Sequence, residues 1–409
     1  MRSLLCAFLV IMSSGPVLSA QKASAHAPIP AADQAQAVRG SNEFAVDLYS
    51  HLSTQPGNLF FSPESISTAF AMTYAGAAGE TATQMARVFH FTLPPDRLHP
   101  AMGALLNQMN AAHSDYELHV ADALWAQQDE NFRPSFLSLV QSDYGAGFHP
   151  VNFRTSPEAV RGDINRWIEH QTNDKIKDML QPGAITPMTR LVLTNAIYFK
   201  GSWVNPFSQS ATQPDAFHLA PAQSVQAPFM HRTGSYSYLD GGTFQAIELP
   251  YQGNDLSMLI LLPKRIDGLP SLEQSFTAAA LSQWIQKLHY ADKVILSLPR
   301  FTMTQQFELS KTLAAMGMPQ AFEAQANFSG MSANSGLKIS AAIHKAFVDV
   351  NETGTEAAAA TSIIMVATSM RQEAPPIVFN ADHPFLFMIR DMKSGSILFV
   401  GRVADPSKQ

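Results

Sequence analysis

The residue patterns that normally mark a catalytic site are missing from this sequence. Its 409 residues contain no Gly-x-Ser-x-Gly, His-Glu-x-x-His, Gly-x-x-x-x-Gly-Lys or Gly-x-Gly-x-x-Gly pattern, so no standard nucleophile, zinc site or phosphate-binding loop is predicted. Residues 335–338 (SGLK) match the Ser-x-x-Lys pattern of penicillin-recognising hydrolases, but the accompanying Lys-Thr-Gly is missing. The 13 histidines show no paired spacing typical of a metal site. A hydrolase stays only as a rival interpretation, and we expect no metal and no cofactor.

One segment near the C-terminus, residues 351–376, has a composition suited to a different task. It contains Gly354, then a run of alanines, then a β-prone apolar stretch at 361–368 (TSIIMVAT). A structureless connection of this length is rare in a compact domain and is usually functional. The alanines would also allow a surface helix, but the β-prone stretch has no polar face at helical spacing.

Read with a period of two, this segment forms two rows that, apart from Glu356, both begin with small residues and become apolar. No other bulky or charged side chain lies in the first half, so such a segment can slide between two existing strands. One row holds Thr355, Ala357, Ala359, Thr361, Ile363, Met365 and Ala367, and the other holds Glu356, Ala358, Ala360, Ser362, Ile364, Val366 and Thr368.

The elements that must position this segment are helical first and extended later. Apolar residues recur at helical spacing around Phe44 and Ile66, and a helix beginning near Pro157 carries Trp167 on one face. This order predicts an α+β fold rather than alternating α/β. The expected strands are 191–199, 244–251, 256–262, 294–301, 338–350, 385–389 and 397–403.

The N-terminus has the three-part pattern of a secretory signal. Arg2 precedes an apolar run, and cleavage after Ala20 or Ala25 closes a segment of residues 1–25. We expect a flexible segment over 26–38, a single domain over 39–409, and a secreted or periplasmic protein. Cys6, the only cysteine, lies inside this signal, so the mature chain is expected to have no disulfide.

Composition narrows the range of partners. With 46 % hydrophobic and 15 % charged residues, the chain has material for a large core. The net charge of −6 provides no basic face for nucleic acid, and no apolar run after the signal is long enough to cross a membrane. We therefore expect neither a nucleic acid nor a membrane as partner.

Five stretches of the chain together resemble the serpin family of serine protease inhibitors. They occur along the chain in the family's order, and the resemblance extends over residues 40–406. The stretch 352–361 is similar to the hinge of inhibitory serpins. The stretches are 352–361 (ETGTEAAAAT), 58–66 (NLFFSPESI), 164–168 with 172–176 (INRWI, TNDKI), 194–203 (TNAIYFKGSW) and 379–387 (FNADHPFLF).

The resemblance implies a five-stranded central sheet, two smaller sheets and eight or nine helices, with residues 351–376 as an exposed reactive-centre loop. It implies a monomeric suicide inhibitor: a serine protease cuts the loop, forms an acyl-enzyme, and is trapped when the loop inserts into the central sheet. A non-inhibitory serpin that acts as a chaperone or binding module is the alternative. Inhibition of cysteine proteases also stays open.

The resemblance also assigns roles to residues of this chain. It places a breach at the top of the sheet, with Arg300 and Glu352 as a charge pair near Trp203. It places a shutter beneath the centre of the sheet, where strands must part, at Ser62, Ser65, Asn195 and His344. The hinge comprises Glu352, Gly354, Thr355, Glu356, Ala357, Ala358, Ala359, Ala360 and Thr361.

The family's spacing from the hinge places the scissile bond between Thr368 and Ser369. Threonine there suits elastase-like or subtilisin-like proteases, which have small or permissive primary pockets. Because the distal side of the loop is slightly long, cleavage after Met370 or Arg371 stays open, and Arg371 would suit a trypsin-like enzyme. Met365 is a further alternative.

Overall fold

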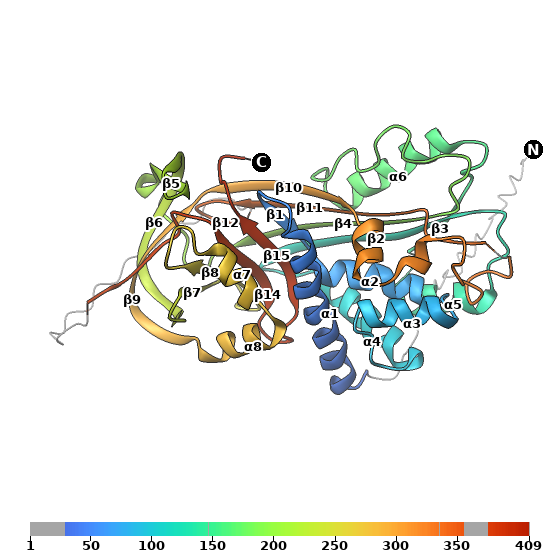
Figure 1. Cartoon of the computed structure of the whole chain (residues 1–409), viewed down its shortest axis with the longest axis horizontal. Coiled ribbons are helices and arrows are strands. Elements are labelled where there is room, and N and C mark those ends of the chain that lie inside the picture. The colour runs from blue at the N-terminus through green and yellow to red at the C-terminus, as the bar shows by residue number, and fades with distance from the viewer. Residues whose placement is uncertain (1–28, 146, 335, 356–374, 409) are drawn as a thin grey trace, which may run out of the picture.

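A six-stranded sheet extends along the long axis of the molecule and separates one helix from most of the others (Figure 1). The computed structural model describes residues 29–408 apart from 146, 335 and 356–374. The strand order in this central sheet is β10 (Phe301–Glu308), β11 (Ala341–Val350), β12 (Gly354–Thr355), β4 (Leu191–Ser202), β2 (Tyr116–Gln127) and β3 (Phe148–Val151).

β4 and β2, the two longest strands of the central sheet, are buried on both faces along most of their length, which explains their largely apolar sequences. β4 pairs antiparallel with β2 from Gly201 opposite Tyr116 to Leu191 opposite Ala126. On its other side β4 pairs parallel with β11, with Asn195 opposite His344. We call this β11–β4 pairing, from Ala341 to Phe347, the seam.

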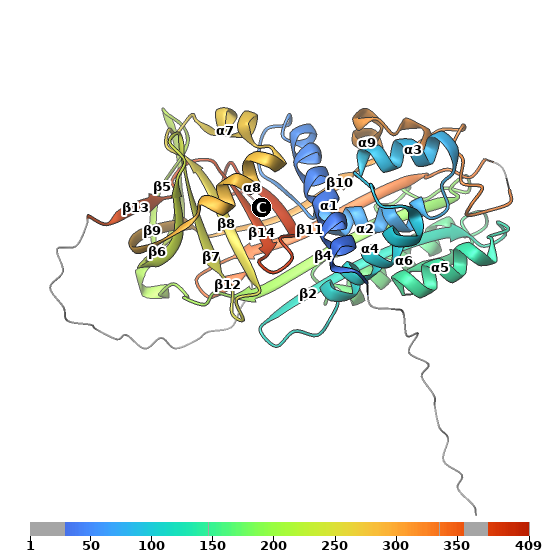
Figure 2. The same cartoon turned by 90° about the horizontal axis from the view of Figure 1, so that it is seen from below.

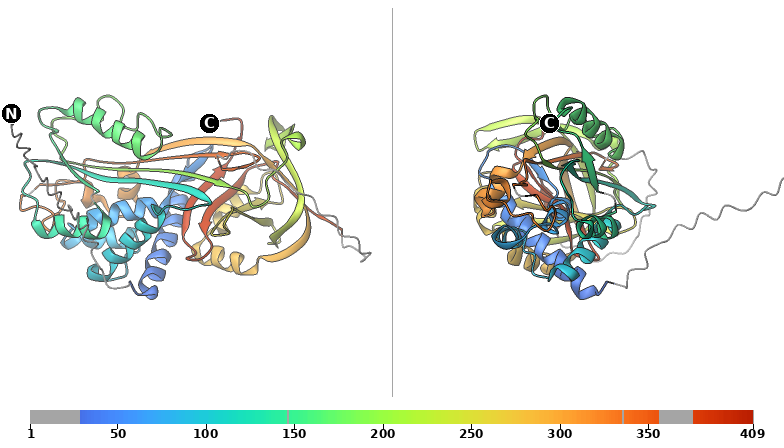
Figure 3. Two further views of the ribbon diagram at one scale, coloured as in Figure 1. Left: turned by 180° about the vertical axis from the view of Figure 1, so that it is seen from behind. Right: turned by 90° about the vertical axis from the view of Figure 1, so that its right-hand side faces the viewer.

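Helices cover the two faces of the central sheet unequally. α6 lies on the outer face, whereas α2 lies beneath the sheet (Figure 3). α2 is almost wholly buried, and Ser62 caps it by accepting a hydrogen bond from the Ser65 N–H. The helices are α1 (Ala31–Leu52), α2 (Pro63–Tyr74), α3 (Gly79–Val88), α4 (Pro95–Met109), α5 (Pro134–Tyr144), α6 (Pro157–Gln171), α7 (Leu269–Ser275), α8 (Ala278–Lys287) and α9 (Ser310–Met316).

The remaining strands form one continuous nine-stranded sheet at the other end of the molecule (Figure 2). The resemblance predicts two smaller sheets, and β6 joins them because its 18 residues pair with β5, β7 and β9 and change register between Gly234 and Tyr236. The strands are β1 (Leu59–Phe61), β5 (Gln213–Ala220), β6 (Gln223–Asp240), β7 (Phe244–Pro250), β8 (Leu256–Pro263), β9 (His289–Pro299), β13 (Ile377–Asn380), β14 (Phe385–Asp391) and β15 (Ile397–Val403).

The α+β class predicted from the sequence is confirmed, with several boundaries moved. The expected strand 294–301 is two strands that separate at Arg300, and the expected strand 338–350 begins only at Ala341. Helix α1 begins at Ala31, inside the segment expected to be flexible, because Asp33 pairs with Arg97 and Val38 is buried. Within the described ranges, no helix is long and apolar enough to cross a membrane.

Candidate functional site

The four residues assigned to the shutter lie together beneath the seam. The Ser62 N–H donates to His344 Nε2 over 3.1 Å, which leaves the imidazole proton on Nδ1. That Nδ1–H donates across the seam to Asn195 Oδ1, and Asn195 Nδ2 in turn donates to Ser65 Oγ. All four residues are buried, so β4, β11 and α2 are linked through one chain of side-chain hydrogen bonds.

A fifth member of this group, Asp122 on β2, was not anticipated from the sequence. Its Oδ1 accepts hydrogen bonds from Asn195 Nδ2 and, over 3.2 Å, from Ser65 Oγ. Burial raises the pKa of Asp122 to about 8. An acidic residue inside the apolar run 118–126 (LHVADALWA) was the available signal, because an acid in a buried strand requires polar partners. We call Ser62, Ser65, Asp122, Asn195 and His344 the polar cluster.

His344 is neutral within the polar cluster. Burial lowers its pKa to about 3, because the charged imidazolium is disfavoured away from water. A neutral imidazole can accept at Nε2 and donate at Nδ1 at the same time, as these contacts require.

Two hinge residues, Gly354 and Thr355, already occupy the central sheet as β12. Thr355 pairs with Val350 of β11 on one side and with Gly201 of β4 on the other. Its side chain is buried, and its Oγ1 lies 2.8 Å from the hydroxyl of Tyr251. Gly354 has φ +154°, and a Cβ there would lie 2.0 Å from the carbonyl oxygen of Gly201. Only glycine fits this approach without displacing the strand.

The residues assigned to the breach surround this short strand. Trp203 donates its backbone N–H to the Thr353 carbonyl and its indole N–H to the Asn351 carbonyl, over 2.9 and 3.0 Å. Buried Glu352 accepts from Thr212 Oγ1 over 2.6 Å. The Arg300–Glu352 ion pair, at 3.6 Å, is looser, because the Arg300 side chain is 49 % exposed.

The segment that follows α6 crosses the outer face of the seam. Lys345 Nζ donates to the Lys177 carbonyl over 2.7 Å, and Gln306 Nε2 donates to the Met179 carbonyl over 3.1 Å. Buried Asn165 of α6 fixes the end of this crossing by hydrogen bonds to the Leu180 backbone. An inserted strand must therefore pass beneath this segment. The resemblance of residues 164–168 and 172–176 predicts a helix that lies across the central sheet and its exit, and the structure adds the hydrogen bonds from Lys345 and Gln306.

The remaining predicted site residues lie outside the described residues. These are the hinge from Glu356 to Thr361 and the candidate cleavage residues Met365, Thr368, Ser369, Met370 and Arg371. The described chain resumes at Pro375 and enters β13 at Ile377.

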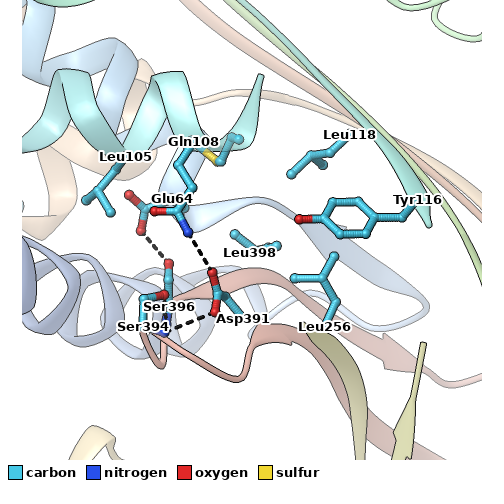
Figure 4. Close-up of a pocket in the computed structure, with 11 residues that line it drawn as sticks. Glu64, Leu105, Gln108, Tyr116, Leu118, Leu256, Asp391, Ser394, Ser396 and Leu398 are labelled. Atoms are coloured by element: carbon cyan, nitrogen blue, oxygen red, sulfur yellow. Dashed lines mark hydrogen bonds between the residues drawn. The ribbon is translucent and has the colours of Figure 1, made fainter. Parts of the chain in front are cut away.

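The rival hydrolase motif gains no support from its surroundings. Lys338 is exposed, and Ser335 is not among the described residues. Within the part of the chain that is described, no group of three His, Cys, Asp or Glu side chains could hold a metal ion. A small pocket beside α2 and α4 contains Glu64 and Asp391, and Glu64 accepts from Ser396 Oγ over 2.8 Å (Figure 4).

The fold and the sequence both have close counterparts. A family model described as serpin (serine protease inhibitor) matches residues 39–406. An uncharacterized serpin-like protein of Thermococcus kodakarensis is 40 % identical over 370 residues, covering 90 % of this chain and 85 % of the relative. The leukocyte elastase inhibitor of Homo sapiens is 40 % identical over 377 residues, covering 90 % of this chain and 98 % of the relative.

Among solved structures, uncleaved ovalbumin has a TM-score of 0.82 at 32 % identity, covering 91 % of this chain and 100 % of that one. The chain belongs to the serpin family, most of whose members are protease inhibitors rather than enzymes.

Proposed function

We propose that this protein is an irreversible inhibitor of serine proteases that acts by inserting its cleaved reactive-centre loop into the seam. The observation that carries the proposal is the register of β12. Thr361 lies six residues after Thr355, and Asn195 and His344 lie six residues before Gly201 and Val350. A strand continued from β12 in the same register would therefore place Thr361 between Asn195 and His344, which face each other across the seam.

The residue types match in this register. The row that contains Thr355 would face inward, because the Thr355 side chain is buried beneath the sheet. Ala357 and Ala359 would then lie beside the bulkier Phe199 and Ile197 of β4. The first polar residue of this row after Thr355 is Thr361, and it would meet the polar cluster. Its hydroxyl could replace the Asn195–His344 hydrogen bond that insertion must break.

Insertion supplies the inhibitory step. The protease serine attacks a loop carbonyl and forms an acyl-enzyme, and the freed segment then adds to the sheet. About 14 residues at ~3.3 Å each make a strand of roughly 45 Å, so the attached protease is carried to the far end of the molecule. Distortion of the protease site by ~1 Å there slows deacylation about 10²-fold.

The driving force is large enough to make the uncut protein metastable. About 14 new ladder hydrogen bonds at ~1 kcal/mol each, with ~2 kcal/mol for each newly buried apolar side chain, give a gain of order 10 kcal/mol. This is comparable to the total stability of a domain. The uncut form must therefore be held by a kinetic barrier, which the seam and the segment that crosses it supply.

We propose Thr368–Ser369 as the scissile bond and elastase-like or subtilisin-like enzymes as targets, with Met370, Arg371 and Met365 as alternative cleavage residues. The relative named leukocyte elastase inhibitor supports the elastase-like class. We also propose that the protein is monomeric and that residues 1–25 act as its secretory signal.

Denaturing gels of the protein mixed with elastase, subtilisin or trypsin test the proposal. We expect an adduct that resists denaturation, and mass spectrometry of the released peptide identifies the cut. Cleavage by all three proteases without any adduct would instead establish the alternative, a non-inhibitory serpin that is merely a substrate. Export is tested separately by sequencing the N-terminus of the protein recovered outside the cytoplasm.

A further inference from the structure

The carboxyl group of Asp122 has an incomplete set of partners. Asp122 is 8 % exposed, and while Oδ1 accepts two hydrogen bonds, Oδ2 is buried without a partner. An ionised carboxylate in this position would leave one oxygen with neither water nor a donor, which is unfavourable. A proton on the carboxyl group removes most of this penalty.

The groups that face Asp122 supply no compensating charge. β4 presents Asn195, α2 presents Ser65, and β11 presents His344, which is neutral and reaches Asp122 only through Asn195. Glu64, on α2, is a second buried acid close to this region, but its carboxyl group is directed to Ser396. Among the described residues, no cation contributes to the pKa of Asp122.

We propose that Asp122 is a proton-operated latch on the seam: the seam is tightest when Asp122 carries a proton and loosens as the proton is lost. Separating β11 from β4 breaks the Asn195–His344 hydrogen bond and admits water to the polar cluster. The ionised carboxylate gains hydration in that open state, whereas the protonated carboxyl gains little.

The pH range of the effect follows from linkage. An Asp122 exposed in the open seam regains its ordinary pKa near 3.8, so opening releases a proton between about pH 4 and pH 8 and becomes easier as the pH rises. His344 acts in the opposite direction: its pKa rises from about 3 to its ordinary 6.5 on opening, so acid favours opening below pH 6.5. Between pH 6.5 and 8 Asp122 therefore acts alone, and full hydration allows up to about a thirty-fold change in the opening equilibrium.

Hydrogen–deuterium exchange of the uncleaved full chain tests this latch without any protease, so its outcome is independent of the proposed inhibitory function. The comparison uses wild type and Asp122→Asn, an isosteric variant that cannot ionise, with exchange followed over 341–350 at pH 6.5 and pH 8. Dividing the exchange rate of wild type by that of Asp122→Asn at each pH cancels the intrinsic pH dependence of exchange. We expect this ratio of rates to rise ten- to thirty-fold from pH 6.5 to pH 8.

Glu64→Gln is the matched control, because Glu64, on α2, is also a buried acid with a raised pKa, but its carboxyl group contacts Ser396 rather than the seam. It should follow wild type at both pH values. An unchanged wild-type to Asp122→Asn ratio, or the same behaviour in Glu64→Gln, would overturn the proposal. Infrared spectroscopy supplies a second measurement: at pH 6.5 wild type should show more protonated-carboxyl absorption than Asp122→Asn. Equal absorption in the two proteins would equally refute the latch.

Discussion

The hydroxyl oxygen of Thr355 lies 2.8 Å from the phenol oxygen of Tyr251, at the end of the central sheet where β12 separates β11 from β4. Both side chains are buried, and the Tyr251 ring stacks on Trp203 with ring centroids 4.5 Å apart. The Thr355 side chain of the hinge is therefore already buried between β11 and β4 before the loop is cut.

Tyr251→Phe removes the phenol partner of Thr355 and leaves a buried hydroxyl unpaired. We expect the free energy that holds β12 in the sheet to fall by about 1–3 kcal/mol, which should be observed as faster deuterium exchange over 350–355. Tyr290→Phe, at a tyrosine that is 70 % exposed, should leave exchange unchanged. Equal exchange in Tyr251→Phe and wild type would show that the hydrogen bond does not hold the hinge.

Thr355→Arg places a long charged side chain where the inserting strand must start. Insertion should slow, so that the acyl-enzyme is hydrolysed before the loop inserts and the inhibitor becomes a substrate. Gels should show the cleaved chain without the adduct. Because Thr355 is buried in the uncut sheet, the arginine should also displace β12 and lower the melting temperature of the uncut chain, with a loss of stability at least as large as the roughly 1–3 kcal/mol expected for the lost hydrogen bond to Tyr251. Thr355→Ser, which keeps the hydroxyl, should still form the adduct; adduct formation by Thr355→Arg would contradict insertion at this position.

Gly354→Ala tests the close approach of β12 to β4. The added Cβ would lie 2.0 Å from the Gly201 carbonyl oxygen, so we expect β12 to leave the sheet at a cost of about 1–3 kcal/mol. A lower melting temperature and a new protease-sensitive site near residue 354 should report this. Gly162→Ala in α6 is the control, since nothing lies within 4 Å of its Cβ and alanine favours helix.

Thr361→Val tests the register argued from β12. The substitution keeps the shape and removes the hydroxyl that would meet Asn195 and His344. The cleaved, inserted form should lose about 1–3 kcal/mol of stability while the uncut form changes little. Ser362→Ala, in the opposite row, should leave both forms near wild type. If the two variants gave equal melting temperatures after cleavage, the inserted strand would have a different register.

The stability of the whole protein in acid should depend on two groups of opposite sign. The pKa of His344 is lower in the folded state than its ordinary 6.5, so its contribution to stability is lost as the pH falls from 6.5 toward about 3. The pKa of Asp122 is raised to about 8, so acid stabilises the folded state through this residue between about pH 8 and 4. In Asp122→Asn the second effect is gone, and the melting temperature should fall more steeply below pH 6.5 than in wild type; parallel curves would contradict these assignments.

The sequence permits prediction of the parts of the site that lie on recognisable segments. Asn195 and His344 occupy strands whose apolar runs are clear, and Ser62 precedes a proline-initiated helix. Asp122 could not be placed, because β2 is buried on both faces and shows no periodicity, and only the register with β4 brings it to Asn195. Strand β12 spans two residues, too few for any period to reveal it. The joining of the two predicted smaller sheets through β6 likewise depends on pairings between distant residues.

At two of its contacts with the sheet, the segment that crosses the seam is held through its own main-chain atoms. Lys345 and Gln306 donate to the carbonyl oxygens of Lys177 and Met179, and every residue type provides a carbonyl. The exposed residue at position 177 can therefore vary during evolution without loss of the attachment, whereas a change at Lys345 or Gln306 removes a donor. Selection on how fast this protein responds to a protease is expected to act on Lys345 and Gln306, whereas homologues should vary at position 177.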